Sequence, residues 1–288
     1  MTVPPFGFGT APILGRLNRH QGLHALETAY SVGIRHFDTA RSYGWGECEA
    51  VLGEFLAGHP RASYTLVSKC GLVPARRTNA LSVAKKLARQ VVTWLPAARG
   101  IVRRFASASQ FSPVATYEVD ALRSSVETSL RELRTSYLDI LILHNFEPGR
   151  PGLDEVIALF RELREQGCIK RFGFSLYGDL NVGLEYLASH DVLTEGVVQV
   201  PVTDQLLELQ PRWRAVNFIA HSPFKYLETR GVAGDTAALR GILTSLAGAA
   251  RCEALVTSMF SEQHITQNVA VQRATRDEFT ALHETFGA

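Results

Sequence analysis

Four polar residues of the sequence are of the types that together could move a proton: Asp38, Tyr43, Lys69 and His144. Asp38, Lys69 and His144 each end an apolar stretch typical of a buried strand, and Tyr43 follows Asp38 in a turn that contains Gly44. Taken singly, each has an ordinary structural interpretation, because Asp and Gly favour surface turns and a lone Lys or His is often solvated or hydrogen-bonded. We expect a shared site because the ends of several strands can meet at one rim of a barrel.

Tyr43 is the residue that could deliver the proton, but its ordinary pKa of about 10 makes it a poor acid at neutral pH. A buried Lys69 ammonium beside the phenol would stabilise the phenolate and lower that pKa. Asp38 would keep the lysine charged and oriented despite burial, and His144 could hold a substrate carbonyl oxygen. These groups supply no hydride, so the chemistry would need a nicotinamide cofactor.

Eight short apolar stretches alternate with segments of helical spacing and would position these groups. The stretches cover residues 6–10, 34–38, 65–69, 137–144, 170–175, 197–201, 217–221 and 253–258. Apolar residues three and four apart predict helices between them, for example over residues 122–133 and 154–163. Such alternation predicts parallel strands with right-handed crossovers. Eight units, with no GxGxxG after the first strand, favour one α/β domain over residues 1–288, a closed (β/α)8 TIM barrel.

A long connection after the third strand, residues 72–117, interrupts this rhythm and contains no acidic residue. Its basic residues are Arg76, Arg77, Lys85, Lys86, Arg89, Arg99, Arg103 and Arg104. An apolar stripe within it predicts an amphipathic helix and is formed by Ala84, Leu87, Ala88, Val91 and Leu95. One interpretation is a helical flap over the barrel rim with solvated charges. The other is a lid that attracts an anionic substrate, or a surface that docks on acidic lipid.

Composition and charge are those of an ordinary globular protein, with 46% hydrophobic residues and a formal net charge of +2, and they indicate no nucleic-acid partner. No apolar run is long enough to cross a bilayer, and the N-terminal stretch MTVPPFGFGT lacks the pattern of a signal peptide. The cysteines are too scattered for a metal or redox pair: Cys48, Cys70, Cys168 and Cys252. We therefore expect a cytoplasmic protein with reduced thiols and no metal.

Three stretches, DTARSYGWGECE, LVSKCG and YLDILILH, together resemble the aldo-keto reductase superfamily. That family has a strand ending in Asp-Thr-Ala, a Tyr-Gly turn with a following Glu, a strand ending in Lys, and a Leu-Asp strand ending in His. The resemblance runs from about Phe6 to Asn268 and implies an oxidoreductase acting on an aldehyde, a ketone or a sugar-like alcohol. It also implies a catalytic tetrad in which the tyrosine is the general acid: Asp38, Tyr43, Lys69 and His144.

The same resemblance implies where a nicotinamide cofactor would bind. Ser175 and Gln199 match residues that hold the nicotinamide amide. Ser222 and the loop that begins at Ser258 match residues that hold the phosphates, and Asn268 matches the adenine position.

Three positions depart from the family pattern. Leu176 stands where an asparagine is usual, and Val202 stands where an aromatic ring would stack on the nicotinamide. Ser261 is nearest to the basic residue that many relatives use for the extra phosphate of NADP. Both NADP(H) and NAD(H) are thus open as cofactor. The departures also support an alternative, a nucleotide-binding barrel with little or no turnover that acts as a sensor or interaction protein.

Overall fold

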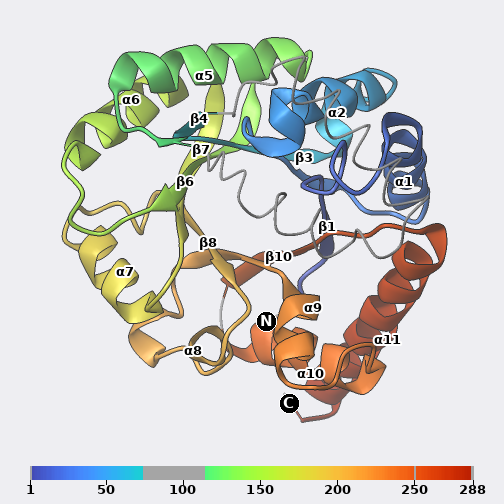
Figure 1. Ribbon diagram of the computed structural model, residues 1–288. Helices are drawn as coiled ribbons and strands as arrows, with labels where there is room; N and C mark the ends of the chain where they lie inside the picture. The colour runs from blue at the N-terminus through green and yellow to red at the C-terminus, as the bar shows by residue number, and fades with distance from the viewer. Residues whose placement is uncertain (1, 74–113, 250, 287–288) are drawn as a thin grey trace, which may run out of the picture.

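The computed structural model describes residues 2–73, 114–249 and 251–286. Eight parallel strands close into a barrel in the order β1-β10-β9-β8-β7-β6-β3-β2 (Figure 1). They are β1 (Phe6–Gly9), β2 (His36–Asp38), β3 (Thr65–Cys70), β6 (Leu138–Phe146), β7 (Ile169–Leu176), β8 (Val197–Pro201), β9 (Asn217–His221) and β10 (Arg251–Thr257). Each predicted strand stretch falls on one of these strands, so the predicted TIM barrel is confirmed.

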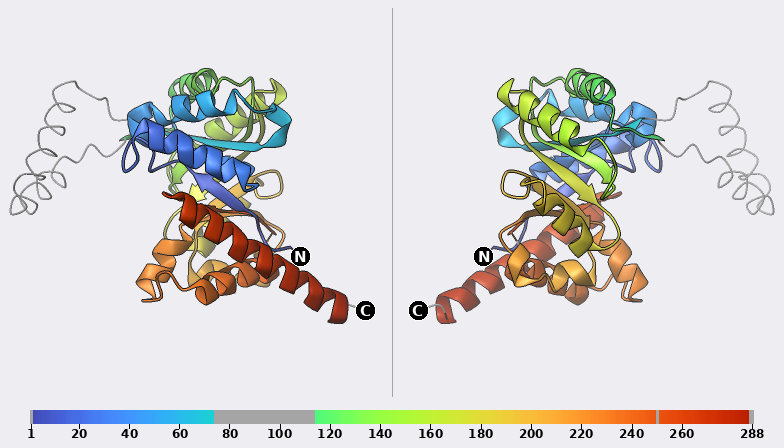
Figure 2. Two further views of the ribbon diagram at one scale, coloured as in Figure 1. Left: turned by 90° about the vertical axis from the view of Figure 1, so that its right-hand side faces the viewer. Right: turned by 90° about the vertical axis from the view of Figure 1, so that its left-hand side faces the viewer.

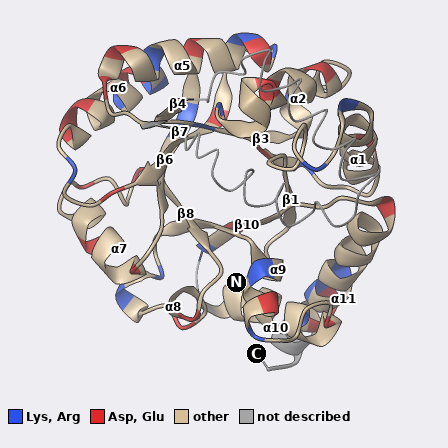
Figure 3. Cartoon of the chain, viewed as in Figure 1, with Lys and Arg blue, Asp and Glu red and all other residues tan. Residues whose placement is uncertain are grey.

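Helices surround the barrel, and the long last helix packs beside the first and the tenth (Figure 2). The α-helices are α1 (Arg19–Ser31), α2 (Cys48–Leu56), α5 (Val119–Glu132), α6 (Leu153–Glu165), α7 (Leu180–Ala188), α8 (Asp204–Leu207), α9 (Pro223–Thr229), α10 (Thr236–Ala249) and α11 (Glu262–Phe286). Short 3-10 helices are η1 (Tyr43–Gly46), η2 (Arg61–Ser63) and η4 (Pro211–Trp213). Charged residues of both signs are spread over the outer helices (Figure 3).

Helix α6 shows how the sequence pattern produces an element. Val156, Phe160 and Leu163 recur at helical spacing, and all three are buried against the barrel. The helix ends before Gly167, whose φ of 74° is a left-handed conformation that glycine adopts without steric cost. The helix predicted from this spacing is therefore confirmed, and so is the one over α5.

The two ends of the long connection after β3 pair with each other. β4 (Leu72–Val73) and β5 (Val114–Ala115) form a two-stranded antiparallel sheet. Residues 74–113 lie outside the described residues, and with them the predicted amphipathic helix and its basic side chains.

The barrel interior is filled by apolar side chains, and polar side chains lie at the carboxyl ends of the strands. Along β6, Ile140, Ile142 and His144 alternate on the inner face, and the two isoleucines belong to the buried cluster that fills the barrel. The cluster consists of Val67, Ile140, Ile142, Val197, Ile219, Ala254 and Val256. The polar groups at the carboxyl ends of the strands therefore lie against this apolar cluster.

Candidate active site

Asp38 and Lys69 form a buried ion pair at the carboxyl ends of the neighbouring strands β2 and β3. The lysine ammonium also donates to the Thr39 carbonyl oxygen at 3.0 Å, and the Gln199 amide donates to the second Asp38 oxygen at 2.7 Å. Burial alone would lower the pKa of Lys69, but the adjacent Asp38 carboxylate outweighs it and the pKa is raised. The lysine therefore stays charged over the physiological range.

Tyr43 lies between this ammonium and a histidine. The Lys69 nitrogen is 5.1 Å from the centroid of the phenol ring. On the other side the ring meets the His144 ring edge to face, with centroids 5.8 Å apart and planes 83° apart. The structure thus brings together Asp38, Tyr43, Lys69 and His144, which the sequence places on three strands and one turn.

The pKa of Tyr43 is raised, because loss of hydration on burial outweighs the lowering effect of the Lys69 charge. The net lowering expected from the sequence is therefore wrong for this structure. The expected Lys69 effect is present with the expected sign, but burial, which cannot be read from a turn sequence, is larger. The phenol is accordingly held protonated, as a proton donor must be before it acts.

His144 is neutral in this setting. Burial and then the nearby Lys69 charge lower its pKa to about 3. Its Nδ1 atom is buried and has no hydrogen-bond partner among the described residues. A neutral imidazole beside the phenol can hydrogen-bond to a substrate oxygen.

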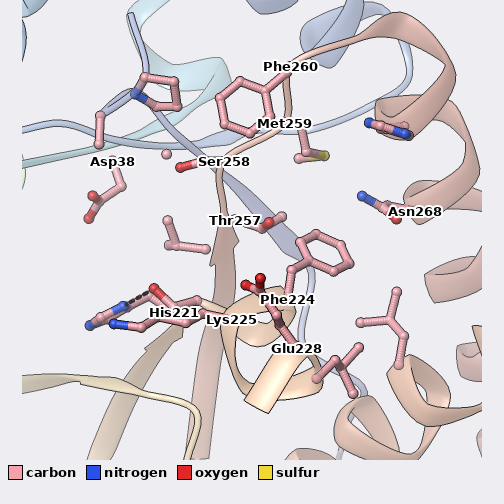
Figure 4. Close-up of a pocket in the computed structure, with 18 of the residues that line it drawn as sticks. Asp38, His221, Phe224, Lys225, Glu228, Thr257, Ser258, Met259, Phe260 and Asn268 are labelled. Atoms are coloured by element: carbon pink, nitrogen blue, oxygen red, sulfur yellow. Dashed lines mark hydrogen bonds between the residues drawn. The ribbon is translucent and has the colours of Figure 1, made fainter. Parts of the chain in front are cut away.

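A cavity of about 1020 Å³ opens beside these groups. Its lining begins at Asp38, Tyr43 and Lys69 and continues to the segments that follow β9 and β10. Figure 4 shows Asp38 at one side of the cavity and Asn268 at the other, with Thr257 and Ser258 between them. The volume slightly exceeds that of common small-ligand pockets and suits a ligand longer than a simple carbonyl compound.

The residues predicted to hold a cofactor are distributed along this cavity. Gln199, Ser222, Ser258 and Asn268 all line it. Ser175 lies next to Gln199 in the strand register and is fully buried, with its hydroxyl oxygen lacking a partner among the described residues. An orphaned hydroxyl beside an amide suits a ligand group that both donates and accepts hydrogen bonds, such as a carboxamide.

The cavity has aromatic residues in its lining that the sequence analysis did not identify. Val202 is buried and is not among the residues that line the cavity. Tyr177, just after β7, and His221, the last residue of β9, line it instead, with ring centroids 5.9 Å apart. Their signal in the sequence was an aromatic residue at the end of a strand, the same signal that identified His144.

The basic lining was also missed. Ser261 is not among the cavity residues, whereas Arg16, Lys225 and His264 are. His264 stands four residues before Asn268 in α11, so both share one helix face, and this spacing could have indicated it. Arg16 comes from the segment between β1 and α1, and its guanidinium lies 5.4 Å from the Phe260 ring centroid.

Two other properties of the described residues bear on function. Within the part of the chain that the structure covers, no three His, Cys, Asp or Glu side chains are grouped to hold a metal ion. None of the described helices combines the length and the apolar character that a membrane span requires.

Comparison with known proteins indicates the same class of protein that the barrel and the polar groups at its strand ends suggest. The sequence model of the Aldo/keto reductase family matches residues 5–206, and the chain belongs to this family. Two similar curated proteins are D-threo-aldose 1-dehydrogenase of Pseudomonas sp., 27% identical over 190 residues, and NADH-specific methylglyoxal reductase of Escherichia coli, 26% identical over 181 residues. Each match covers 60% of this chain but only 50% and 48% of the relatives, so the chain spans about half their length.

Solved structures agree on the fold. An aldo/keto reductase from Klebsiella pneumoniae, in complex with NADP and acetate, superposes with a TM-score of 0.65 over 99% of this chain and 92% of its own, at 22% identity. The aldo-keto reductase AKR11C1 from Bacillus halodurans gives a TM-score of 0.67 at 20% identity, over 96% of this chain and 92% of its own.

Proposed function

We propose that the protein transfers a hydride between a nicotinamide cofactor and a small carbonyl or alcohol substrate, with Tyr43 as the general acid and base. The observation that carries this proposal is the position of the Tyr43 phenol between the Lys69 ammonium and the neutral His144 ring, at the end of a long cavity. Membership of the Aldo/keto reductase family supports the same chemistry.

In the reducing direction, Tyr43 would donate its proton to the carbonyl oxygen as negative charge develops there. Lys69 would stabilise the phenolate that results, and Asp38 holds the ammonium in place by the buried ion pair. His144 would hydrogen-bond to the same oxygen and orient the carbonyl. The cofactor, when bound, supplies the hydride.

The cavity fits such a cofactor in three places. At the end of the cavity near Tyr43, the Gln199 amide nitrogen donates a hydrogen bond to Asp38. The Gln199 carbonyl oxygen and the Ser175 hydroxyl could then bind a carboxamide. Ser222 and Ser258 offer hydroxyl groups farther along, and Asn268 an amide at the far end. One relative whose name specifies NADH, and one similar structure in complex with NADP, support either form of the cofactor.

A titration with NADH and with NADPH, followed by protein fluorescence, tests this proposal. We expect at least one of the two to bind with a dissociation constant well below millimolar. Failure of both to bind at millimolar concentration would remove the oxidoreductase proposal.

A second function is favoured by one observation. Leu176 is buried and apolar where an amide side chain would assist cofactor binding. A barrel that binds the nucleotide but turns over little, as a sensor or interaction protein, is the alternative. The same titration separates the two when it is paired with an assay of carbonyl reduction on aldehydes, ketones and anionic carbonyl compounds. Binding without any turnover would support the sensor.

A further inference from the structure

The turn that carries Tyr43 has a strained backbone. Gly44, Trp45 and Gly46 all adopt positive φ angles, of 57°, 62° and 86°. Glycine tolerates this conformation, but a tryptophan does so at a steric cost, and such residues persist only when their surroundings hold them. The contacts that hold this turn therefore decide where the phenol lies.

Arg41 stabilises this turn through its guanidinium group. One guanidinium nitrogen donates to the Gly46 carbonyl oxygen, and another forms an ion pair with Glu49. The Glu49 side chain is completely buried, and that of Arg41 is 13% exposed. A planar guanidinium that bridges two acceptors fixes both distance and direction, because its donors have a rigid geometry.

The same network reaches the strand that carries Lys69. The second Glu49 oxygen accepts a hydrogen bond of 2.6 Å from the hydroxyl of Ser68, the residue directly before Lys69. The Arg41 backbone N–H donates to the Lys69 carbonyl oxygen at 3.2 Å. Glu49 therefore connects the Tyr43 turn, through Arg41, to the β3 strand that carries Lys69, through Ser68.

These side chains lie outside the cavity. Arg41, Glu49 and Ser68 are absent from its lining as the described residues define it. They therefore differ from Asp38, Lys69 and His144, which are in or beside the reaction space.

We propose that Arg41, Glu49 and Ser68 form a positioning network that sets the separation of the Tyr43 phenol and the Lys69 ammonium. This inference rests on the proposed function for its catalytic meaning, but the positioning itself does not require turnover. The attraction between phenolate and ammonium falls with their separation, so a relaxed turn weakens the lowering effect of Lys69 on the pKa of Tyr43. Burial, which raises that pKa, would then be opposed less.

The variants Glu49→Gln and Ser68→Ala test the network. Each removes one connection, and Ser68→Thr keeps the hydroxyl. Biosynthetic replacement of tyrosine by 3-fluorotyrosine makes the phenols more acidic and visible by ¹⁹F NMR, and Tyr43→Phe assigns the Tyr43 signal.

We expect the Tyr43 signal to titrate at higher pH in Glu49→Gln and Ser68→Ala, and at the original pH in Ser68→Thr. The direct electrostatic effect of Glu49→Gln has the opposite sign, because removal of a negative charge lowers the pKa of a neighbouring phenol. A rise therefore reports a change of position. An unchanged or lowered titration in both variants would overturn the inference.

A matched control separates positioning from a general loss of stability. Arg171 and Glu253 form another partly buried ion pair, between the strands β7 and β10, and no hydrogen bond or ion pair of the described residues joins it to the Tyr43 turn. Glu253→Gln should lower the stability without moving the Tyr43 titration. An equal shift in this control would show that any loosening of the barrel suffices, which would also overturn the network.

The catalytic consequence is measured separately. For a misplaced acid we expect kcat to fall by about 10- to 100-fold in Glu49→Gln, with unchanged cofactor affinity. If the ¹⁹F titration shifts but neither NADH nor NADPH binds, the proposed function fails and the network stands. If the cofactor binds and turnover is normal in every variant, with no shift, the network fails and the proposed function stands.

Discussion

The two ends of the barrel each carry a carboxylate held by cationic side chains, but they differ in what surrounds it. At the amino ends of the strands, Asp139 accepts hydrogen bonds from Arg61 at 2.7 Å, from Lys170 at 2.8 Å and from the Leu66 backbone N–H at 2.9 Å. At the carboxyl ends, Asp38 is held by Lys69 and Gln199.

The cluster around Asp139 is complete in itself. Arg61 also donates to the Thr135 hydroxyl and to the Tyr137 carbonyl oxygen, and its guanidinium lies 3.8 Å from the Tyr137 ring centroid. Its polar groups thus find partners within the protein, which is the arrangement expected of a contact that only stabilises the barrel.

At the carboxyl ends of the strands, by contrast, several buried polar groups have no hydrogen-bond partner among the described residues. Five buried side-chain atoms in the described part of the chain lack partners: His36 Nε2, Thr39 Oγ1, His144 Nδ1, Ser175 Oγ and Thr257 Oγ1. All but His36 Nε2 belong to residues at the carboxyl ends of the strands, near the Asp38–Lys69 pair. Leaving such groups unpaired lowers stability, so their concentration beside one cavity indicates a site that a ligand completes. In this molecule, the unsatisfied groups around the Asp38–Lys69 pair, and not the ion pair alone, distinguish the candidate site from the Asp139 cluster.

Substitution of the proposed acid gives the largest expected effect. Tyr43→Phe should lower the rate of carbonyl reduction by about 10²- to 10⁴-fold, because it removes the proton donor and retains the ring. Cofactor affinity and the unfolding temperature should change little. Steady-state kinetics with the unsubstituted protein as reference provides the measurement, and full activity in the variant would refute the role of Tyr43.

A pH-dependent effect of intermediate size is expected at His144. Its pKa of about 3 lies below the ordinary value of about 6.5, so the unfolded chain takes up a proton first as the pH falls. Stability therefore decreases with falling pH between these two values. Between pH 7 and pH 5, the free energy of unfolding of the protein should fall by about 2 kcal/mol more than that of His144→Gln. The variant lacks the proton uptake by the unfolded state.

Urea unfolding at both pH values measures this difference. His221, whose pKa is lowered to about 4 chiefly by burial, contributes equally to both proteins and cancels. Equal losses in the two proteins would mean that His144 is solvated and not held neutral.

The smallest effect is expected at the amino ends of the strands. Asp139→Asn should lower the free energy of unfolding by about 1–2 kcal/mol at pH 7 and leave turnover unchanged, because the cluster is partly solvated and far from the cavity. Burial raises the pKa of Asp139, but the bonds from Lys170, Leu66 and Arg61 outweigh this and lower it.

The sign of the pH effect follows from that lowered pKa. The stabilisation by Asp139 is complete above its unfolded pKa of about 3.9 and is lost as the pH falls through the lower folded value. Unfolding curves of the two proteins should therefore converge in acid. A large loss of turnover in Asp139→Asn would contradict the division between the two ends.

The four residues proposed as a catalytic tetrad could be singled out from sequence because each has a local signal. Asp38, Lys69 and His144 each follow an apolar stretch at or near the carboxyl end of a strand, and parallel strands in a barrel present these ends at one rim. The residues proposed to bind the cofactor have weaker signals in the sequence. His221 and Tyr177 also follow strands, but nothing in their own segments says that their rings lie 5.9 Å apart on one cavity.

The sequence by itself determined the eight strands, the helices between them and the side chains that meet at one rim, because apolar periodicity is a local property. Only the tertiary structure decided how these groups behave. The raised pKa of Tyr43, the neutral state of His144 and the connection from Arg41 through Glu49 to Ser68 depend on burial and on distances between segments far apart in the chain. Such quantities arise from packing, and no single stretch of sequence contains them.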